Sequence, residues 1–271
     1  MINNLNDLHK AIVSKEPLSV VRMGNVEITA LLQEQGIYSQ MYTNAGFYGS
    51  PDIYLKWKNK YVKAILNSDV ILDVFTCPSF IIQGDLMVKL NSWKPTLPYN
   101  EDPIYWAKLL EMINEPVGVV SFFKADITRQ LGKMDKIWNL PKLKNKNIVV
   151  VKAFNTIKGN EPHENWLKTF VELQKRVDKH PHIRIWLVSC GCYGLPLCDY
   201  IKSKGCRAIY VGGLLQLLFG LKGKRWDERK EVVKYYNKHW RYPEEKPANA
   251  EHVEGGCYWK AKSPENTSST S

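Results

Sequence analysis

Short apolar runs recur along the chain, and they lack a clean alternation of apolar and polar residues. They are rich in Val and Ile and cover residues 18–22, 70–75, 117–122, 148–151, 183–189 and 208–211. Runs of this kind are typical of strands that are covered on both faces, as in a parallel sheet. The pattern therefore predicts buried, mostly parallel strands.

Helical patterns lie between these runs. Apolar residues recur at steps of three and four over residues 51–66, 165–177 and 195–204. The last pattern stops at Gly205, and glycine is common just beyond the end of a helix. Alternation of strands and helices at this spacing predicts an α/β fold with a Rossmann-like, doubly wound, mostly parallel sheet.

The chain predicts a single domain over residues 1–260. The proline-containing stretch 92–103 and the stretch 139–147 are candidate breaks, but neither has the length or composition of a clear linker. Residues 261–271 are rich in Ser and Thr and almost without large apolar side chains, so we expect a disordered tail there.

Composition and charge narrow the function classes. With 44% hydrophobic and 24% charged residues, the chain of 271 residues is neither a disordered polymer nor a fibrous repeat. A net charge of +11 suggests an anionic partner without identifying it. No apolar run approaches the ~20 residues that span a bilayer, and the N-terminus lacks the features of a signal peptide. We therefore expect a cytoplasmic protein.

The six cysteines do not predict a metal site. Four of them fall between residues 190 and 206, but their spacing lacks the paired C-x-x-C arrangement of structural zinc sites. Cys190 has no particular histidine placed to activate it as a nucleophile. Small buried thiols in a reducing compartment are the better interpretation.

The first candidate turn follows the strand predicted over residues 18–22. Because ligands of open parallel sheets bind at the carboxyl ends of strands, its polar residues are candidate ligands. Arg22 suits a phosphate, Gly24 permits a tight turn, and Asn25 and Glu27 suit a cation, with Glu27 also suited to act as a base. The alternative is structural, with Asn25 as a helix cap and Glu27 at the positive helix end.

The second candidate turn follows the strand predicted over residues 183–189. Ser189, Gly191, Tyr193 and Gly194 lie between this strand and a helix. The glycines allow a ligand to approach the backbone, and free N–H groups at a helix start attract anions. The alternative is a tight turn without a ligand.

The third candidate turn follows the strand predicted over residues 208–211. Gly212 and Gly213 precede an apolar helix, and the cations Lys222, Lys224 and Arg225 come after it. Flexible backbone together with cations suits a diphosphate. The alternative is a solvated loop. Three such turns in one α/β chain favour a nucleotide or a phosphorylated ligand.

Three further polar residues are candidates for acid–base chemistry. Asp126 follows the strand predicted over residues 117–122, and His163 and Glu164 lie in a loop that enters a helix. Each could act on a substrate hydroxyl. A role in capping a helix is an equally open interpretation of the His163–Glu164 segment.

Several motifs together resemble one family. V-V-R-M-G-N-V-E, from residue 20, resembles the R-x-G-D-x-E segment of GT-D-type glycosyltransferases, first described as a domain of unknown function. Further similar segments are S-C-G-C-Y-G-L-P-L-C-D-Y-I-K, A-I-Y-V-G-G-L-L-Q-L-L-F-G-L-K-G-K-R-W-D, N-A-G-F-Y, V-G-V-V-S-F-F-K-A-D-I-T-R-Q and V-E-G-G-C-Y-W. The resemblance runs from about residue 18 to residue 259, with no match over 75–114.

The resemblance implies a Rossmann-like fold and inverting transfer of a sugar from a nucleotide-sugar donor. In this family an Asp-x-Glu motif works with a divalent cation, Mn²⁺ or Mg²⁺, at the donor diphosphate. Here Asn25 replaces the aspartate and Glu27 is retained. An amide is a weaker ligand than a carboxylate, so Arg22 and the Lys222–Arg225 loop are candidates to supply positive charge directly.

The function expected from the resemblance is glycosyl transfer to a glycan, a lipid-linked sugar or a glycoprotein. Glu27 is the first candidate for the base, followed by Asp126, His163 and Glu164. A lipid-linked acceptor would place the protein at a membrane surface. One alternative is a non-catalytic protein that binds an anionic polysaccharide or nucleic acid, although its basic residues do not interleave with aromatic ones. Another is a sugar-phosphate isomerase on a similar scaffold.

Overall fold

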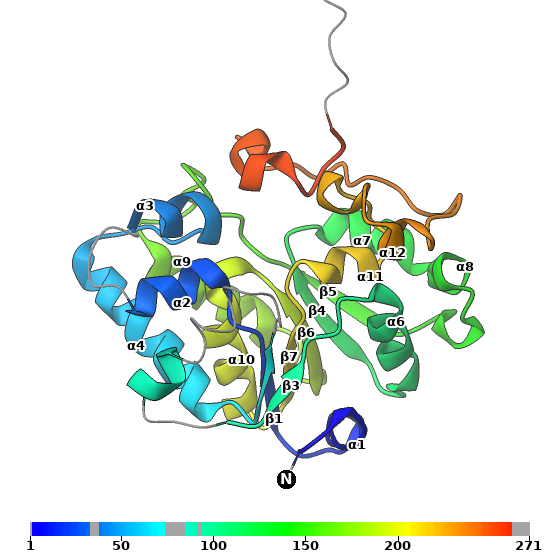
Figure 1. Ribbon diagram of the computed structural model, residues 1–271, viewed down its shortest axis with the longest axis horizontal. Helices are drawn as coiled ribbons and strands as arrows, with labels where there is room; N and C mark the ends of the chain where they lie inside the picture. Colours follow the sequence, from blue (N-terminus) through cyan, green and yellow to red (C-terminus); the bar gives the residue numbers. More distant parts are fainter. Residues whose placement is uncertain (1, 33–37, 74–84, 91–93, 262–271) are drawn as a thin grey trace, which may run out of the picture.

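A computed structural model describes residues 2–32, 38–73, 85–90 and 94–261. Its centre is a sheet of seven parallel strands in the order β3-β2-β1-β7-β6-β4-β5 (Figure 1). The strands are β1 (Leu18–Val21), β2 (Val70–Asp73), β3 (Thr96–Pro98), β4 (Val117–Ser121), β5 (Ile148–Lys152), β6 (Ile185–Ser189) and β7 (Arg207–Tyr210). The doubly wound α/β fold predicted from the sequence is confirmed.

All six strands predicted from apolar runs are present, and the sequence pattern missed β3. This strand is three residues long and lies at the edge of the sheet, within the stretch interpreted as a candidate break. Pro98 is tolerated there because an edge strand does not need every N–H group for pairing. The predicted tail over 261–271 lies almost wholly outside the described residues, and the domain boundary stays a prediction.

Helices cover both faces of the sheet (Figure 1). The helices packed into one apolar core are α2 (Asn25–Leu32), α4 (Pro51–Asn67), α9 (Trp166–Asp178) and α10 (Gly194–Ser203). Those packed into the other are α1 (Leu5–Val13), α6 (Pro103–Met112), α7 (Lys124–Leu131), α8 (Met134–Trp138), α11 (Leu214–Leu218) and α12 (Lys230–Val233). The short elements are α3 (Tyr38–Gln40), η1 (Met41–Ala45), η2 (Pro141–Leu143), η3 (Gly191–Tyr193), η4 (Lys224–Trp226), η5 (Ala250–His252) and η6 (Glu254–Gly256).

Strand β1 shows why the central runs lack polar alternation. Leu18 and Val20 point into one core and Val21 into the other, because successive side chains of a strand face opposite sides. Since helices cover both sides, both sets of positions are buried. The same residue types therefore serve two separate cores.

The chain reverses its direction of travel across the sheet between β1 and β7. Strand β1 pairs with β2 on one side and with β7 on the other. A crevice outside the carboxyl ends of strands at such a reversal is where open α/β sheets bind ligands. In Figure 1 the last described segment, in orange and red, lies across this end of the sheet.

The predicted buried thiols are confirmed where the structure describes them. Cys190, Cys192, Cys198 and Cys206 are free and buried, and Cys257 is free and half-buried. Burial raises the pKa of the Cys190 thiol. A buried thiol with a raised pKa is a poor nucleophile, which agrees with a packing role. The sixth cysteine, at position 77, lies outside the described residues.

Packing across the sheet predicts a stability effect at Gly118 in β4. A Cβ atom there would lie 2.2 Å from Cε3 of Trp186 in the neighbouring strand β6. Gly118→Ala should lower the free energy of unfolding by about 1–3 kcal/mol, since the buried indole must shift. Urea unfolding measures this change.

Gly132→Ala is the matched control, because a Cβ atom at Gly132 would meet nothing within 4 Å. We expect its free energy of unfolding to equal or slightly exceed that of the unmodified protein. Equal stability of the two variants would show that the Gly118–Trp186 contact is not tight.

Candidate active site

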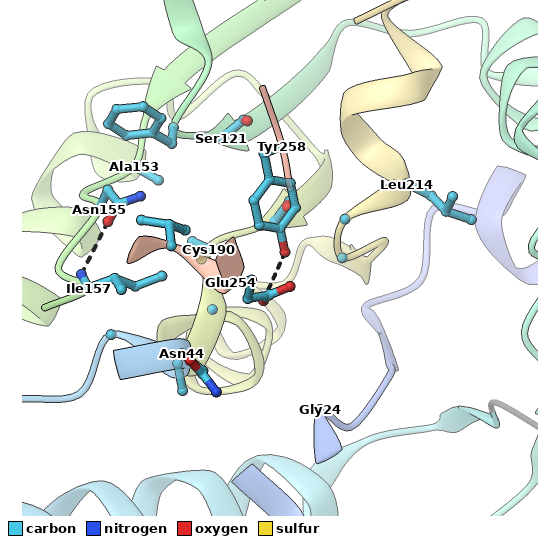
Figure 2. A pocket seen from close by; sticks show the side chains of 18 of the residues that line it. Gly24, Asn44, Ser121, Ala153, Asn155, Ile157, Cys190, Leu214, Glu254 and Tyr258 are labelled. Atoms are coloured by element: carbon cyan, nitrogen blue, oxygen red, sulfur yellow. Dashed lines mark hydrogen bonds between the residues drawn. The ribbon is translucent and has the colours of Figure 1, made fainter. Parts of the chain in front are cut away.

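A cavity of about 520 Å³ opens at the carboxyl ends of the strands. Residues that follow β1, β3, β4, β5, β6 and β7 line it, together with η1 and the segment 253–259 (Figure 2). Its volume falls within the range of small-molecule sites. It lies where the reversal between β1 and β7 predicts a ligand.

Two arginines meet at the turn after β7. Gly212 has a left-handed backbone with φ +67, and a Cβ atom there would lie 3.4 Å from Nη1 of Arg22. A Cβ atom at the next residue, Gly213, would lie 3.5 Å from Nη1 of Arg225. Two consecutive glycines therefore let two guanidinium groups approach one turn, an arrangement that suits a ligand with more than one phosphate.

An aromatic ring holds Arg22. Its guanidinium carbon lies 5.0 Å from the centre of the Tyr99 ring, and the Tyr99 hydroxyl donates to the carbonyl of Val211 at 2.7 Å. Within the described ranges, Arg22 forms no ion pair with a carboxylate, and its buried Nε lacks a hydrogen-bond partner. The charge of Arg22 thus has no ion-pair partner in this part of the chain.

Arg225 has polar partners on the C-terminal segment. Its Nη1 donates to the Tyr258 hydroxyl at 3.0 Å and lies 3.3 Å from Oε2 of Glu254. The Tyr258 hydroxyl donates to Oε1 of Glu254 at 3.0 Å, the bond drawn in Figure 2. The three side chains close one wall of the cavity.

Glu27 is a buried carboxyl group in the first turn of α2. It is 7% exposed and packs against Gly24, where a Cβ atom would lie 2.1 Å from its Oε2. Burial raises the pKa of Glu27 to about 7, although a backbone hydrogen bond and Arg22 lower it. A carboxyl group with a pKa near neutrality suits proton transfer, because both protonation states are populated.

The predicted divalent-cation site does not fit these side chains. Asn25 contributes only an amide, and Glu27 contributes a single carboxyl group that is buried against Gly24. Mg²⁺ and similar cations prefer several oxygen ligands, carboxylates above all. Over residues 2–32, 38–73, 85–90 and 94–261, no cluster of three His, Cys, Asp or Glu side chains is placed to hold a metal ion.

The structure brings most of the predicted binding residues together. Those that line the cavity are Arg22, Gly24, Asn25, Glu27, Ser189, Gly191, Tyr193, Gly212, Gly213 and Arg225. Gly194, Lys222 and Lys224 do not line it. Gly194 packs under the Tyr210 ring, the Lys222 ammonium lies 4.8 Å from the centre of the Tyr236 ring, and Lys224 is exposed.

Asp126, His163 and Glu164 do not line the cavity, and their assignment as catalytic candidates stays a prediction. Asp126 is fully buried, pairs with Arg129 through Oδ1, and accepts the N–H groups of residues 244 and 245 through Oδ2. Nδ1 of His163 lies 2.9 Å from Oγ1 of Thr169, and Glu164 is exposed. Of the four predicted acid–base candidates, Glu27 alone lines the cavity.

Sequence reasoning missed several residues that line the cavity. Tyr99 and Glu101 follow β3, a strand that was not predicted, and Arg229 pairs with Glu101 at 2.7 Å. Glu254 and Tyr258 belong to the V-E-G-G-C-Y-W segment, which carried no assigned chemistry. The two consecutive glycines beside a carboxylate in this segment were the sequence signal that could have indicated a binding loop.

Comparison with known proteins agrees with this architecture. No family model and no curated protein matches the sequence. A solved structure described as a new glycosyltransferase (DUF1792) from Streptococcus sanguinis is similar in fold, with a TM-score of 0.51 and 12% identity. The match covers 89% of this chain and 94% of that one. At this identity, the similarity shows a shared fold.

A second solved structure, a selenomethionine-substituted domain of unknown function 1792, gives the same result. Its TM-score is 0.50 at 13% identity, and the match covers 92% of this chain and 93% of that one. The fold implied by the GT-D resemblance is therefore confirmed. In the part of the chain that the structure describes, no helix has the length and apolar character needed to cross a membrane.

The raised pKa of Glu27 predicts a pH dependence of stability. The folded protein holds this proton more tightly than the unfolded chain between the ordinary pKa of 4.5 and about 7. The free energy of unfolding should therefore fall as pH rises through this window, by on the order of 3 kcal/mol in total, and level off above it.

Glu27→Gln should remove this contribution, since an amide does not titrate. Urea unfolding of the two proteins at several pH values between 4.5 and 8 gives the difference curve. Parallel curves for the unmodified protein and the variant would mean that Glu27 titrates normally.

Proposed function

We propose that the protein is a glycosyltransferase that uses a nucleotide-sugar donor. The observation that carries this proposal is the meeting of Arg22 and Arg225 at the Gly212–Gly213 turn, in a cavity that Glu27 also lines. The shared fold with a structure described as a glycosyltransferase supports it. Two arginines in one site suit the departure of a diphosphate. A carboxyl group whose pKa lies near neutrality suits the uptake of a proton.

In this proposal the donor diphosphate binds against the two guanidinium groups. Guanidinium groups form paired hydrogen bonds to phosphate oxygens. Gly212 lets a ligand approach the backbone beside Arg22, since the glycine has no side chain of its own. Ser189 and Gly191 line the neighbouring part of the cavity, where the sugar would lie beside the diphosphate.

The transfer would be a single displacement with inversion. An acceptor hydroxyl oxygen forms a bond to the anomeric carbon while the bond from that carbon to the diphosphate oxygen breaks. The electron pair leaves with the diphosphate, whose growing negative charge the two arginines stabilise. Glu27 acts as the general base of the reaction and takes the proton of the acceptor hydroxyl.

We propose no divalent cation for this reaction, because Asn25 and Glu27 do not fit one and the arginines provide positive charge. The acceptor would be a glycan, a lipid-linked sugar or a glycoprotein. The cavity is more than the solvated basic surface that a polymer-binding protein needs, which favours a small-molecule donor over the alternative of a non-catalytic polymer-binding protein. A cytoplasmic location stays a prediction.

A thermal-shift screen tests donor binding. UDP-, GDP-, dTDP- and CMP-linked sugars are each added with manganese or with EDTA. A donor at ~100 times its Kd should stabilise the protein by roughly 2.7 kcal/mol, and we expect one nucleotide class to raise the Tm equally in EDTA. A shift that requires manganese would contradict the metal-free site, and no shift with any donor would contradict the proposed function.

Substitutions separate binding from chemistry. Arg22→Gln should weaken binding of the selected donor by roughly 10- to 100-fold, since hydrogen bonds to charged groups are lost. Lys224→Gln, which removes the same charge outside the cavity, should leave the Kd nearly unchanged. Titration calorimetry measures both.

Glu27→Gln should lower kcat by about 10²- to 10⁴-fold while the donor Kd changes little, because the lost group acts on the acceptor proton. Single-turnover assays of sugar transfer measure the rate. A variant that loses donor binding in parallel with kcat would assign Glu27 to binding instead.

A further inference from the structure

We infer that Glu254 is an internal counter-ion at Arg225, which a ligand with two linked phosphates replaces when it binds both arginines. A ligand with one phosphate binds Arg22 without replacing it. This inference rests on the proposed function, because it assigns the two arginines to one anionic ligand. It adds a residue from a segment that sequence reasoning left without a role.

The contacts of Glu254 are those that an anionic ligand would use. Its Oε2 lies 3.3 Å from Nη1 of Arg225, and its Oε1 accepts the Tyr258 hydroxyl at 3.0 Å. Carboxylate and phosphate oxygens bind guanidinium donors in the same manner. Glu254 thus occupies donors that would otherwise face the cavity.

The two arginines differ in whether a carboxylate already pairs with them. Arg22 stacks on Tyr99 and has no ion-pair partner among the described residues, whereas Arg225 is paired. A first phosphate can therefore bind Arg22 without displacing a carboxylate. A second phosphate that takes the Nη1 donor of Arg225 must replace Glu254, so full contact with both arginines requires a ligand with enough charge to compete.

The backbone around Glu254 leaves room for this residue to move. Its φ of +48 lies in the left-handed region, which is unfavourable for a residue with a side chain, and Gly255 and Gly256 follow with φ of +66 and +73. A Cβ atom at Gly255 would meet nothing within 4 Å, so the segment has space on that side. The pair with Arg225 is also partly exposed, which makes it weak enough to exchange.

Glu254 also acts on Glu27, another of the carboxyl groups that line the cavity. Its charge contributes to the raised pKa of Glu27, after the larger effect of burial. Glu254 therefore also opposes an anion that enters the cavity. A ligand that replaces it at Arg225 removes this opposition.

The test measures binding of inorganic phosphate and pyrophosphate to the full chain by titration calorimetry. The unmodified protein should bind pyrophosphate more tightly than phosphate. Glu254→Gln should tighten pyrophosphate binding by roughly tenfold, leave phosphate binding nearly unchanged and so widen the ratio between the two Kd values, since only pyrophosphate competes with the Glu254 charge at Arg225. Tyr258→Phe, which removes the hydroxyl that holds Glu254, should tighten pyrophosphate binding by less.

Glu251→Gln is the matched control. It removes the same charge three residues earlier, and Glu251 is exposed, contacts His252 and does not line the cavity. We expect both Kd values to stay within about twofold of the unmodified protein, because surface charges act weakly at a distance. The same tightening in both variants would reduce the effect to net charge and overturn the inference.

Other outcomes separate this inference from the proposed function. If a nucleotide sugar binds but Glu254→Gln leaves or weakens pyrophosphate binding, the inference falls and the proposed function stands. If no nucleotide sugar binds but Glu254→Gln selectively tightens pyrophosphate, the counter-ion role stands and sugar transfer falls. If none of the proteins binds pyrophosphate, the inference falls, and the screen with nucleotide sugars alone decides the proposed function.

Discussion

The turn after β7 is the constraint on which the cavity depends. Gly212 adopts a left-handed backbone, and the next residue, Gly213, also lacks a side chain. A larger residue at either position would compete for the space beside Arg22 or Arg225. Because β7 lies next to β1 in the sheet, this one turn brings together residues that are about two hundred positions apart in sequence.

The net charge of the chain is a poor guide to the site. Among the described residues that line the cavity, Arg22, Arg225 and Arg229 are matched in number by Glu27, Glu101 and Glu254. Arg229 is paired with Glu101, Arg225 with Glu254, and Glu27 has a pKa raised to about 7. The positive potential available to a ligand therefore centres on Arg22. The lysines elsewhere on the surface contribute little to the potential in the cavity, because solvent and salt screen their charges over that distance.

The local sequence pattern was sufficient to predict the interior strands of the sheet. It was insufficient to predict the edge strand of the sheet and the C-terminal segment that lines the cavity. Runs such as Val117–Ser121 are buried on both faces, so their composition alone identifies them. Strand β3 is too short and too proline-rich to carry such a signal. Arg22 and Glu27 were found because they follow a recognisable strand. Glu254 was missed because its place depends on long-range packing of a segment that forms only short 3-10 helices. The sequence could not show that Asp126 binds the distant backbone groups of residues 244 and 245.

The pairing of the first strand with the last has a consequence for how the protein is made. A ribosome releases β1 long before β7, yet β1 needs β7 as a neighbour on one side. Although β1 can pair with β2, its other edge must stay open, a site where other chains can add, until β7 has been synthesised. Nascent chains of this architecture are natural clients for factors that shield exposed strands during translation.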